Sequence, residues 1–130
     1  MSTSIPTDLR YTDDHEWLRA AGTSWRVGIT QFAADQLGDI TLVDLTAKVG
    51  DLVAKGKQFG TVESVKSVSE LYAPVSGKIT AVNPSLKDAP ELINSEPFAG
   101  GWMIEIEPTD KAELDGLLSP DAYTKHVAAQ

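Results

Sequence analysis

The sequence between Gly60 and Gly77 is GTVESVKSVSELYAPVSG, and this stretch decides the fold. Two apolar, β-prone runs flank one lysine, Lys66, whose neighbours Val65 and Ser67 are small. Runs of this kind predict a pair of strands with the lysine in their connection. A lysine at such an apex projects into water with nothing bulky beside it. An enzyme could therefore reach its ammonium group and attach another group to it.

Turn signals lie on both sides of this predicted hairpin. Residues 50–53 (GDLV) precede it and residues 76–79 (SGKI) follow it, and each stretch predicts a turn that leads into a strand. The apex contains no Gly, Asn or Pro, so the hairpin is predicted from its strands and not from turn chemistry. This order of turn, strand, lysine, strand and turn resembles the two quasi-symmetric halves of lipoyl and biotinyl carrier domains.

The residues beside the lysine carry a more specific resemblance. Glu63-Ser64-Val65-Lys66 is similar to the attachment hairpin of the glycine cleavage H-protein family. Further stretches resemble landmarks of that family and occur in its order: residues 11–17 (YTDDHEW), 27–30 (VGIT), 37–39 (LGD), 94–98 (NSEPF) and 101–102 (GW). A bare lipoyl domain is shorter and lacks the first and last of these landmarks. Two positions depart from the family pattern, Thr46 in place of proline and Phe98 in place of tyrosine, and both lie outside the hairpin.

Periodicity in the rest of the chain predicts mainly strands. Alternation of apolar and polar residues, or a return to apolar β-prone sequence, predicts strands at 25–29, 40–45 and 102–106. Thr30 is expected to cap a short helix at 31–37 that Gly38 ends. A capping-box spacing from Asp88 to Glu91 predicts one helical turn that runs through Asn94.

After Pro108 the pattern becomes helical. Asp110 and Glu113 form an acidic capping pair, and the following leucines are expected to form one apolar stripe: Leu114, Leu117 and Leu118. Ser119-Pro120 has the cap and the first-turn proline of a last helix. Residues 1–130 are therefore expected to form one carrier domain. The resemblance implies a mainly β fold, a barrel-sandwich hybrid or flattened β-barrel of the lipoyl/biotinyl type, with short helices that include C-terminal ones.

Composition limits the classes of function. The chain has 130 residues, 42% hydrophobic and 23% charged, as one globular domain would. Its formal charge of −8 argues against nucleic-acid binding, which depends on neutralising phosphates with Lys and Arg. No apolar run approaches the roughly 20 residues that cross a bilayer, and the first residues resemble neither a signal peptide nor a transit peptide. We expect a cytoplasmic protein with no membrane partner, or a mitochondrial matrix protein if the chain is a mature eukaryotic one.

The sequence lacks the residues that several kinds of catalytic site require. The chain has no cysteine, so it has no disulfide, no thiolate metal site and no cysteine nucleophile. Its two histidines do not make a metal site on their own. His15 next to Glu16 suggests an acid–base pair, but no glycine-framed serine completes a hydrolase triad. The three tryptophans are interpreted as packing residues: Trp17, Trp25 and Trp102.

The resemblance implies a carrier with no turnover of its own. Lipoate would be joined to Lys66 through an amide by a lipoate ligase or a lipoyl/octanoyl transferase, in a hairpin that includes Glu63, Ser64, Val65 and Ser67. The P protein, a pyridoxal-phosphate glycine decarboxylase, would load an aminomethyl group onto the arm. The T protein, an aminomethyltransferase, would pass it to tetrahydrofolate, and the L protein, dihydrolipoamide dehydrogenase, would reoxidise the arm. A monomer is expected.

The resemblance also implies that the loaded arm folds into a cleft of its own domain. The cargo is a protonated amine that water can destroy. A carboxylate nearby favours the charged form of such an amine, and exclusion of water slows its loss. Glu16, Glu70 and Asp14 are the candidates for these contacts. The alternative is that these side chains are solvated surface carboxylates.

Two other functions remain open at this point. A biotin carboxyl carrier would use the same fold, but its lysine normally lies between two methionines, where this chain has Val65 and Ser67. A lipoyl relay that donates lipoyl groups to 2-oxoacid dehydrogenases would need the same hairpin. Intact mass separates a lipoylated chain from a biotinylated one, because the two groups add different masses.

Overall fold

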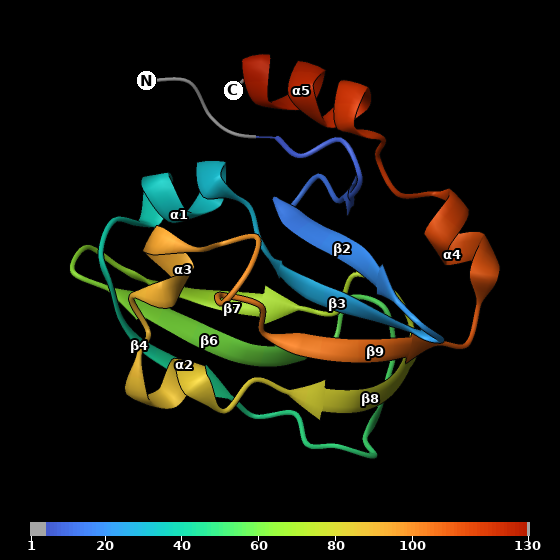
Figure 1. Ribbon diagram of the computed structural model, residues 1–130, viewed down its shortest axis with the longest axis horizontal. Coiled ribbons are helices and arrows are strands. Elements are labelled where there is room, and N and C mark those ends of the chain that lie inside the picture. The colour runs from blue at the N-terminus through green and yellow to red at the C-terminus, as the bar shows by residue number, and fades with distance from the viewer. Residues whose placement is uncertain (1–4, 130) are drawn as a thin grey trace.

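Two antiparallel sheets form the fold in the computed structural model, which describes residues 5–129 (Figure 1). In this part of the chain the larger sheet has the order β1 (Arg10–Tyr11), β2 (Glu16–Ala21), β3 (Ser24–Ile29), β9 (Ile104–Pro108), β8 (Gly77–Val82) and β5 (Leu52–Val53). The smaller sheet has the order β4 (Ile40–Leu45), β6 (Gln58–Ser64) and β7 (Val68–Tyr72). The expected mainly β architecture is confirmed.

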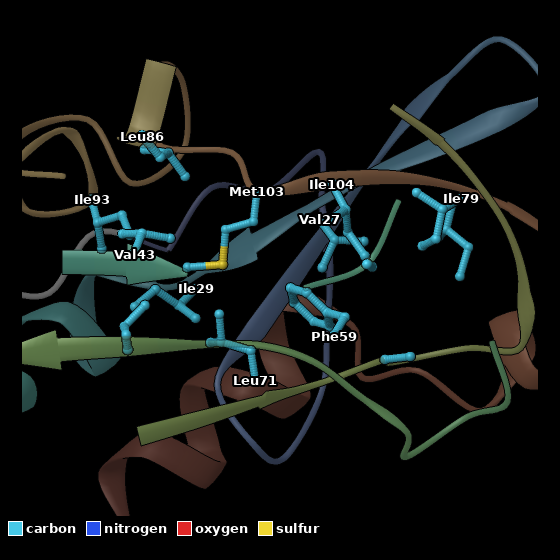
Figure 2. Packing of buried hydrophobic residues seen from close by; sticks show 14 of the residues in the cluster. Val27, Ile29, Val43, Phe59, Leu71, Ile79, Leu86, Ile93, Met103 and Ile104 are labelled. Atoms are coloured by element: carbon cyan, nitrogen blue, oxygen red, sulfur yellow. The ribbon is translucent and has the colours of Figure 1, made fainter. Parts of the chain in front are cut away.

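The core lies between the two sheets. Figure 2 shows Val27 of β3 and Ile104 of β9 opposite Phe59 of β6, with Met103 beside them. Each of these four side chains is at most 1% exposed. Burial of one such side chain stabilises the folded state by about 1.5–3 kcal/mol. The packing of these side chains therefore fixes the two sheets relative to each other, and with them the position of the hairpin that β6 and β7 form.

A second cluster attaches both ends of the chain to the larger sheet. Trp17 is fully buried and its Nε1 donates a hydrogen bond of 2.8 Å to the Pro97 carbonyl. Gly28 makes room for this ring, because a Cβ at Gly28 would lie 2.7 Å from it. The rings of Tyr11 and Tyr123 stack with their centroids 4.5 Å apart. The tryptophan is thus a packing residue, as the sequence predicts.

The helices lie around the sheets. They are α1 (Gln31–Leu37), α2 (Ser85–Asp88), α3 (Leu92–Ser95), α4 (Lys111–Asp115) and α5 (Pro120–Ala128). Both predicted caps of α1 are present, since the Thr30 side chain accepts from Ala33 N and Gly38 N donates to Ala34 O. Figure 1 shows α5 at the edge of the molecule beyond β2, and α5 contacts β1. Within residues 5–129 no helix is long and apolar enough to cross a membrane.

The helical turn predicted through Asn94 is present as α3, but Asp88 does not cap it. Asp88 ends α2, and α3 begins only at Leu92 with no side-chain cap. Two effects explain the difference. The N–H of Ala89 is already bonded to the Ser85 carbonyl, and the residue before Pro90 is driven out of the helical region, here to φ −135° and ψ 65°.

The leucine stripe is also corrected. α4 ends at Asp115 with Gly116 as its cap, so Leu117 and Leu118 lie beyond the helix. Leu118 instead exchanges two backbone hydrogen bonds with Tyr11, of 2.7 and 2.9 Å. Asp110 caps α4 as predicted. Glu113 does not fold back on it.

The Glu113 carboxylate bonds a different part of the chain. It accepts from the N–H and the hydroxyl of Ser76, at 2.6 and 3.1 Å, and so ties α4 to the turn before β8. The last predicted strand begins later than expected, since β9 starts at Ile104 and not at Trp102. The departure at Thr46 has a local explanation, because its N–H donates 3.0 Å to the Phe59 carbonyl and proline could not.

Candidate functional site

Lys66 lies at the exposed apex of the β6–β7 hairpin. Glu63 pairs with Val68 at the last rung, and the Ser64 N–H donates a bond of 2.8 Å to the Ser67 carbonyl. Figure 1 shows this turn projecting from one end of the smaller sheet. The predicted hairpin is therefore present, and its lysine faces water.

The Ser64 hydroxyl closes this apex. Its Oγ accepts hydrogen bonds of 3.1 Å from the N–H groups of both Lys66 and Ser67. It also donates to the Ser67 carbonyl at 3.2 Å. A serine that bonds the backbone two and three residues ahead replaces the Gly or Asn that tight turns usually require. This was the turn signal that the sequence analysis did not identify.

A cleft of about 360 Å³ runs along the free edge of β7. One group of its lining residues comes from α1: Ala33, Gln36 and Leu37. The turn before β2 contributes Asp14 and His15, and β2 contributes its first residue, Glu16. β7 contributes Ser69, Glu70, Leu71 and Tyr72. All three carboxylates singled out from the sequence thus line the same cleft. Their contact with a cargo stays a prediction.

Glu16 differs from the other two carboxylates because it is buried. Its side chain is 5% exposed, whereas Asp14 and Glu70 are exposed. Within residues 5–129 its carboxyl has one hydrogen-bond partner, the Thr12 hydroxyl at 3.1 Å. The pKa of Glu16 is raised to about 8, mainly by burial. The hydrogen bond from Thr12 acts to lower this pKa, and the nearby carboxylates of Asp14 and Asp13 act to raise it. Near neutral pH most of this acid therefore keeps its proton.

The turn that presents Glu16 has a strained residue. His15 has a φ of 66°, a left-handed conformation that is unusual for a residue other than glycine. Its carbonyl accepts from Thr30 N at 2.9 Å, and its Nδ1 lies 2.9 Å from the Tyr123 hydroxyl. α5 therefore holds the turn from outside. The ring of His15 makes this anchoring contact.

Glu70 lies on β7 together with a residue that the sequence analysis did not name. The Tyr72 hydroxyl donates a hydrogen bond to Oε2 of Glu70. This bond is the main reason that the pKa of Tyr72 is raised. Residues two apart on a strand share a face, so the spacing of Glu70 and Tyr72 is the signal that could have found the pair.

The arrangement suits a primary amine at the end of a long arm. β7 has five residues, or about 16 Å of strand, with the exposed lysine beyond one end and Tyr72 at the other. A buried acid and an exposed carboxylate lie along this path. Such groups stabilise a cation that reaches them and leave a neutral ligand with unpaired polar groups.

Comparison with known proteins identifies the family. The profile of the family described as glycine cleavage H-protein matches residues 9–130. The chain belongs to this family. A probable glycine cleavage system H protein of Haloarcula marismortui is 54% identical over 98% of this chain and 99% of its own length. The glycine cleavage system H protein of Myxococcus xanthus is 52% identical over 95% of each chain.

A solved structure agrees with this assignment. The crystal structure of a glycine cleavage system H protein from Mycobacterium marinum superposes with a TM-score of 0.82 at 40% identity. The match covers 93% of this chain and 97% of that one. The predicted lipoyl-type flattened barrel is thereby confirmed, and so is the predicted role as the lipoyl-bearing shuttle of glycine cleavage.

We predict that Glu16→Gln stabilises the protein at alkaline pH. The folded protein keeps a proton on Glu16 between about pH 4.5, where an ordinary glutamate titrates, and about pH 8. The unfolded chain releases that proton, so wild-type stability falls as pH rises through this window. The amide needs no proton, so the advantage of the variant should grow by on the order of a few kcal/mol between about pH 5 and pH 9.

Urea denaturation at a series of pH values measures this difference. Glu91→Gln removes one exposed glutamate and controls for the loss of a negative charge. A Glu16→Gln advantage that stays constant from acid to alkaline pH would show that Glu16 is not held as a neutral acid.

Proposed function

We propose that this chain carries its lipoyl group as an amide on Lys66 and shelters the aminomethyl cargo in the cleft along β7. The observation that carries the proposal is the exposed apex, which Ser64 closes and in which Lys66 has only small neighbours. Residues 1–130 are proposed to form one carrier domain.

The described residues fit an amide-linked lipoyl arm. Lys66 is exposed, so a modifying enzyme has access to its amine. The exposed side chains beside it, Val65 and Val68, place no charge next to the amide. When attached, lipoate supplies the disulfide that accepts the aminomethyl group and the dithiol that is later reoxidised. The chain has no cysteine that could exchange with that disulfide.

Glu16 and Glu70 are proposed to hold the ammonium of the cargo. Glu16 keeps its proton near neutral pH, because burial raises its pKa. An ammonium beside it favours the ionised form, so docking of the protonated amine releases the Glu16 proton to solvent. Glu70, fixed by the Tyr72 hydroxyl, contributes a second carboxylate at the rim, and Asp14 a third. α1 covers the opposite wall and restricts access of water.

The chain is proposed to have no turnover of its own. Its partners would be the P protein that loads the arm, the T protein that unloads it, the L protein that reoxidises it, and a lipoate ligase or lipoyl/octanoyl transferase. The formal charge of −8 supports a protein that meets several partners without adhering to nucleic acid. We expect a monomer in the cytoplasm, or in the mitochondrial matrix for a mature eukaryotic chain.

We predict that Lys66 is the lysine that becomes lipoylated. Lys66→Ala should fold with unchanged stability, because the side chain is exposed, and should gain no lipoyl mass when incubated with lipoate, ATP and a lipoate ligase. Intact mass followed by peptide mapping makes the measurement. Lys57→Ala and Lys78→Ala are matched controls and should accept lipoate like wild type. Lipoyl found on either of those lysines would overturn the assignment, and a biotin increment in the native host would indicate the other carrier class.

We also predict that the carboxylates lengthen the lifetime of the loaded form. Glu16→Gln and Glu70→Gln should leave lipoylation and reoxidation of the arm unchanged and release ammonia faster after the decarboxylase is removed. An ion pair at the rim stabilises by up to about 1 kcal/mol and a sheltered one by more, so we expect lifetimes shortened up to about fivefold in Glu70→Gln and more than about fivefold in Glu16→Gln.

Glu91→Gln controls for net charge and should match wild type. If both cleft variants also match wild type, Glu16 and Glu70 do not hold the cargo, and its protection comes from elsewhere.

A further inference from the structure

The apex of the hairpin is bonded to a segment far away in the sequence. The N–H of Val65 donates a hydrogen bond of 3.0 Å to the carbonyl of Asp39. Asp39 lies between the end of α1 and the start of β4, in a segment of three residues that we call the 38–40 segment (Gly38, Asp39 and Ile40). The residue next to the attachment lysine is thus fixed from outside its own hairpin.

One side chain of α3 holds the 38–40 segment on both sides of Asp39. Nδ2 of Asn94 donates 2.9 Å to the carbonyl of Gly38, and Oδ1 of Asn94 accepts 2.9 Å from the N–H of Ile40. Because these bonds flank Asp39, they fix the direction of the carbonyl that Val65 uses. Figure 1 shows α3 between α1 and the smaller sheet, where this contact is made.

Gly38 also contacts the lysine directly. A Cβ at Gly38 would lie 3.0 Å from Cε of Lys66 and 3.8 Å from its Nζ, so the lysine stem lies across the bare backbone of this residue. Gly38 has φ 82° and ψ −162°, a region that only glycine readily adopts. The residue before it, Leu37, lines the cleft. The stem therefore starts beside the α1 wall of the cleft.

We infer that Asn94 and Gly38 are positioning residues for Lys66. Asn94 fixes the 38–40 segment so that the apex keeps one orientation towards the modifying enzyme, and Gly38 leaves room for the lysine stem at the mouth of the cleft. The inference rests on the proposed lipoylation of Lys66. The competing view is that Ser64 alone holds the apex, in which case the 38–40 segment only packs against it.

Hydrogen exchange of the Val65 amide separates these views without any cofactor. In Asn94→Ala the carbonyl of Asp39 loses its fixed direction, so the Val65 amide should exchange about tenfold faster than in wild type. Asn83→Ala is the matched control, because the Asn83 amide likewise bridges backbone groups away from the apex: it donates to the carbonyls of Gly100 and Trp102 and accepts from the N–H of Ser85. This variant should leave Val65 exchange unchanged. Equal exchange of Val65 in the two variants would overturn the inference.

Lipoylation kinetics give the functional readout. Asn94→Ala should lower kcat/KM for lipoylation by a lipoate ligase about tenfold, because a misplaced nucleophile reacts more slowly, while Asn83→Ala stays within about twofold of wild type. Asn94→Asp keeps the acceptor for Ile40 but loses the donor to Gly38, and should lie between Asn94→Ala and wild type. Identical kcat/KM values for Asn94→Ala and Asn83→Ala would contradict the role of Asn94.

Gly38→Ala tests the contact with the stem. Its matched control is Gly50→Ala, which is strained by a φ of 98° but meets nothing within 4 Å. The unfolding midpoints of both variants separate a loss of stability from a slower modification. Of the two variants, only Gly38→Ala should slow lipoylation. Equal rates would overturn the role of Gly38. If wild type itself accepts no lipoyl group on Lys66, the proposed function fails, and the Val65 exchange still decides the inference about Asn94.

Discussion

The burial of one carboxyl, Glu16, is the constraint on which the rest of the cleft depends. An acid that is 5% exposed and keeps its proton up to about pH 8 destabilises the folded chain once it ionises. A cation that reaches it removes that cost, so the cleft is poised for an amine and not for an anion. The strained backbone of His15 and the bond from α5 to its ring are understandable as the supports of this arrangement.

The opposite requirement applies at Lys66. The lysine must be accessible to a modifying enzyme, while the group that it carries must later leave water. The fold separates these demands along β7, with the exposed apex beyond one end and the acid-lined cleft along the strand. Because β7 is an edge strand, no neighbouring strand blocks the path between them. The two sheets and their shared core fix the positions of the apex and the cleft relative to each other.

Much of this arrangement could be predicted from the sequence, for reasons that are local. Alternation predicted β3, and the cap of Thr30 predicted α1, because both signals depend on residues close together in the chain. The hairpin around Lys66 followed from its two strands. The cap predicted at Asp88 and the leucine stripe failed, because a proline and the strand-like pairing of Leu118 with Tyr11 outweighed local helix signals.

The rest of the site depended on contacts between distant residues. The burial of Glu16 and the contact of Asn94 with the 38–40 segment join parts of the chain that no local pattern relates. In the sequence, Gly38 indicated the end of a helix and Asn94 the end of a helical turn, and both lie in family landmarks. Their contacts join residues far apart in the chain, so only the three-dimensional structure shows their physical role.

The central claim is that the cargo lies in the cleft beside Glu16 and not in water. Lipoylated protein loaded from glycine labelled with ¹³C at its α-carbon would carry that label in the methylene of the cargo. Isotope-filtered NOEs from this methylene then report its neighbours directly. The account predicts NOEs to cleft side chains such as Leu71 and Ile29. A methylene with narrow lines and no NOE to the cleft, or with NOEs only to Val65 and Val68 at the apex, would contradict it.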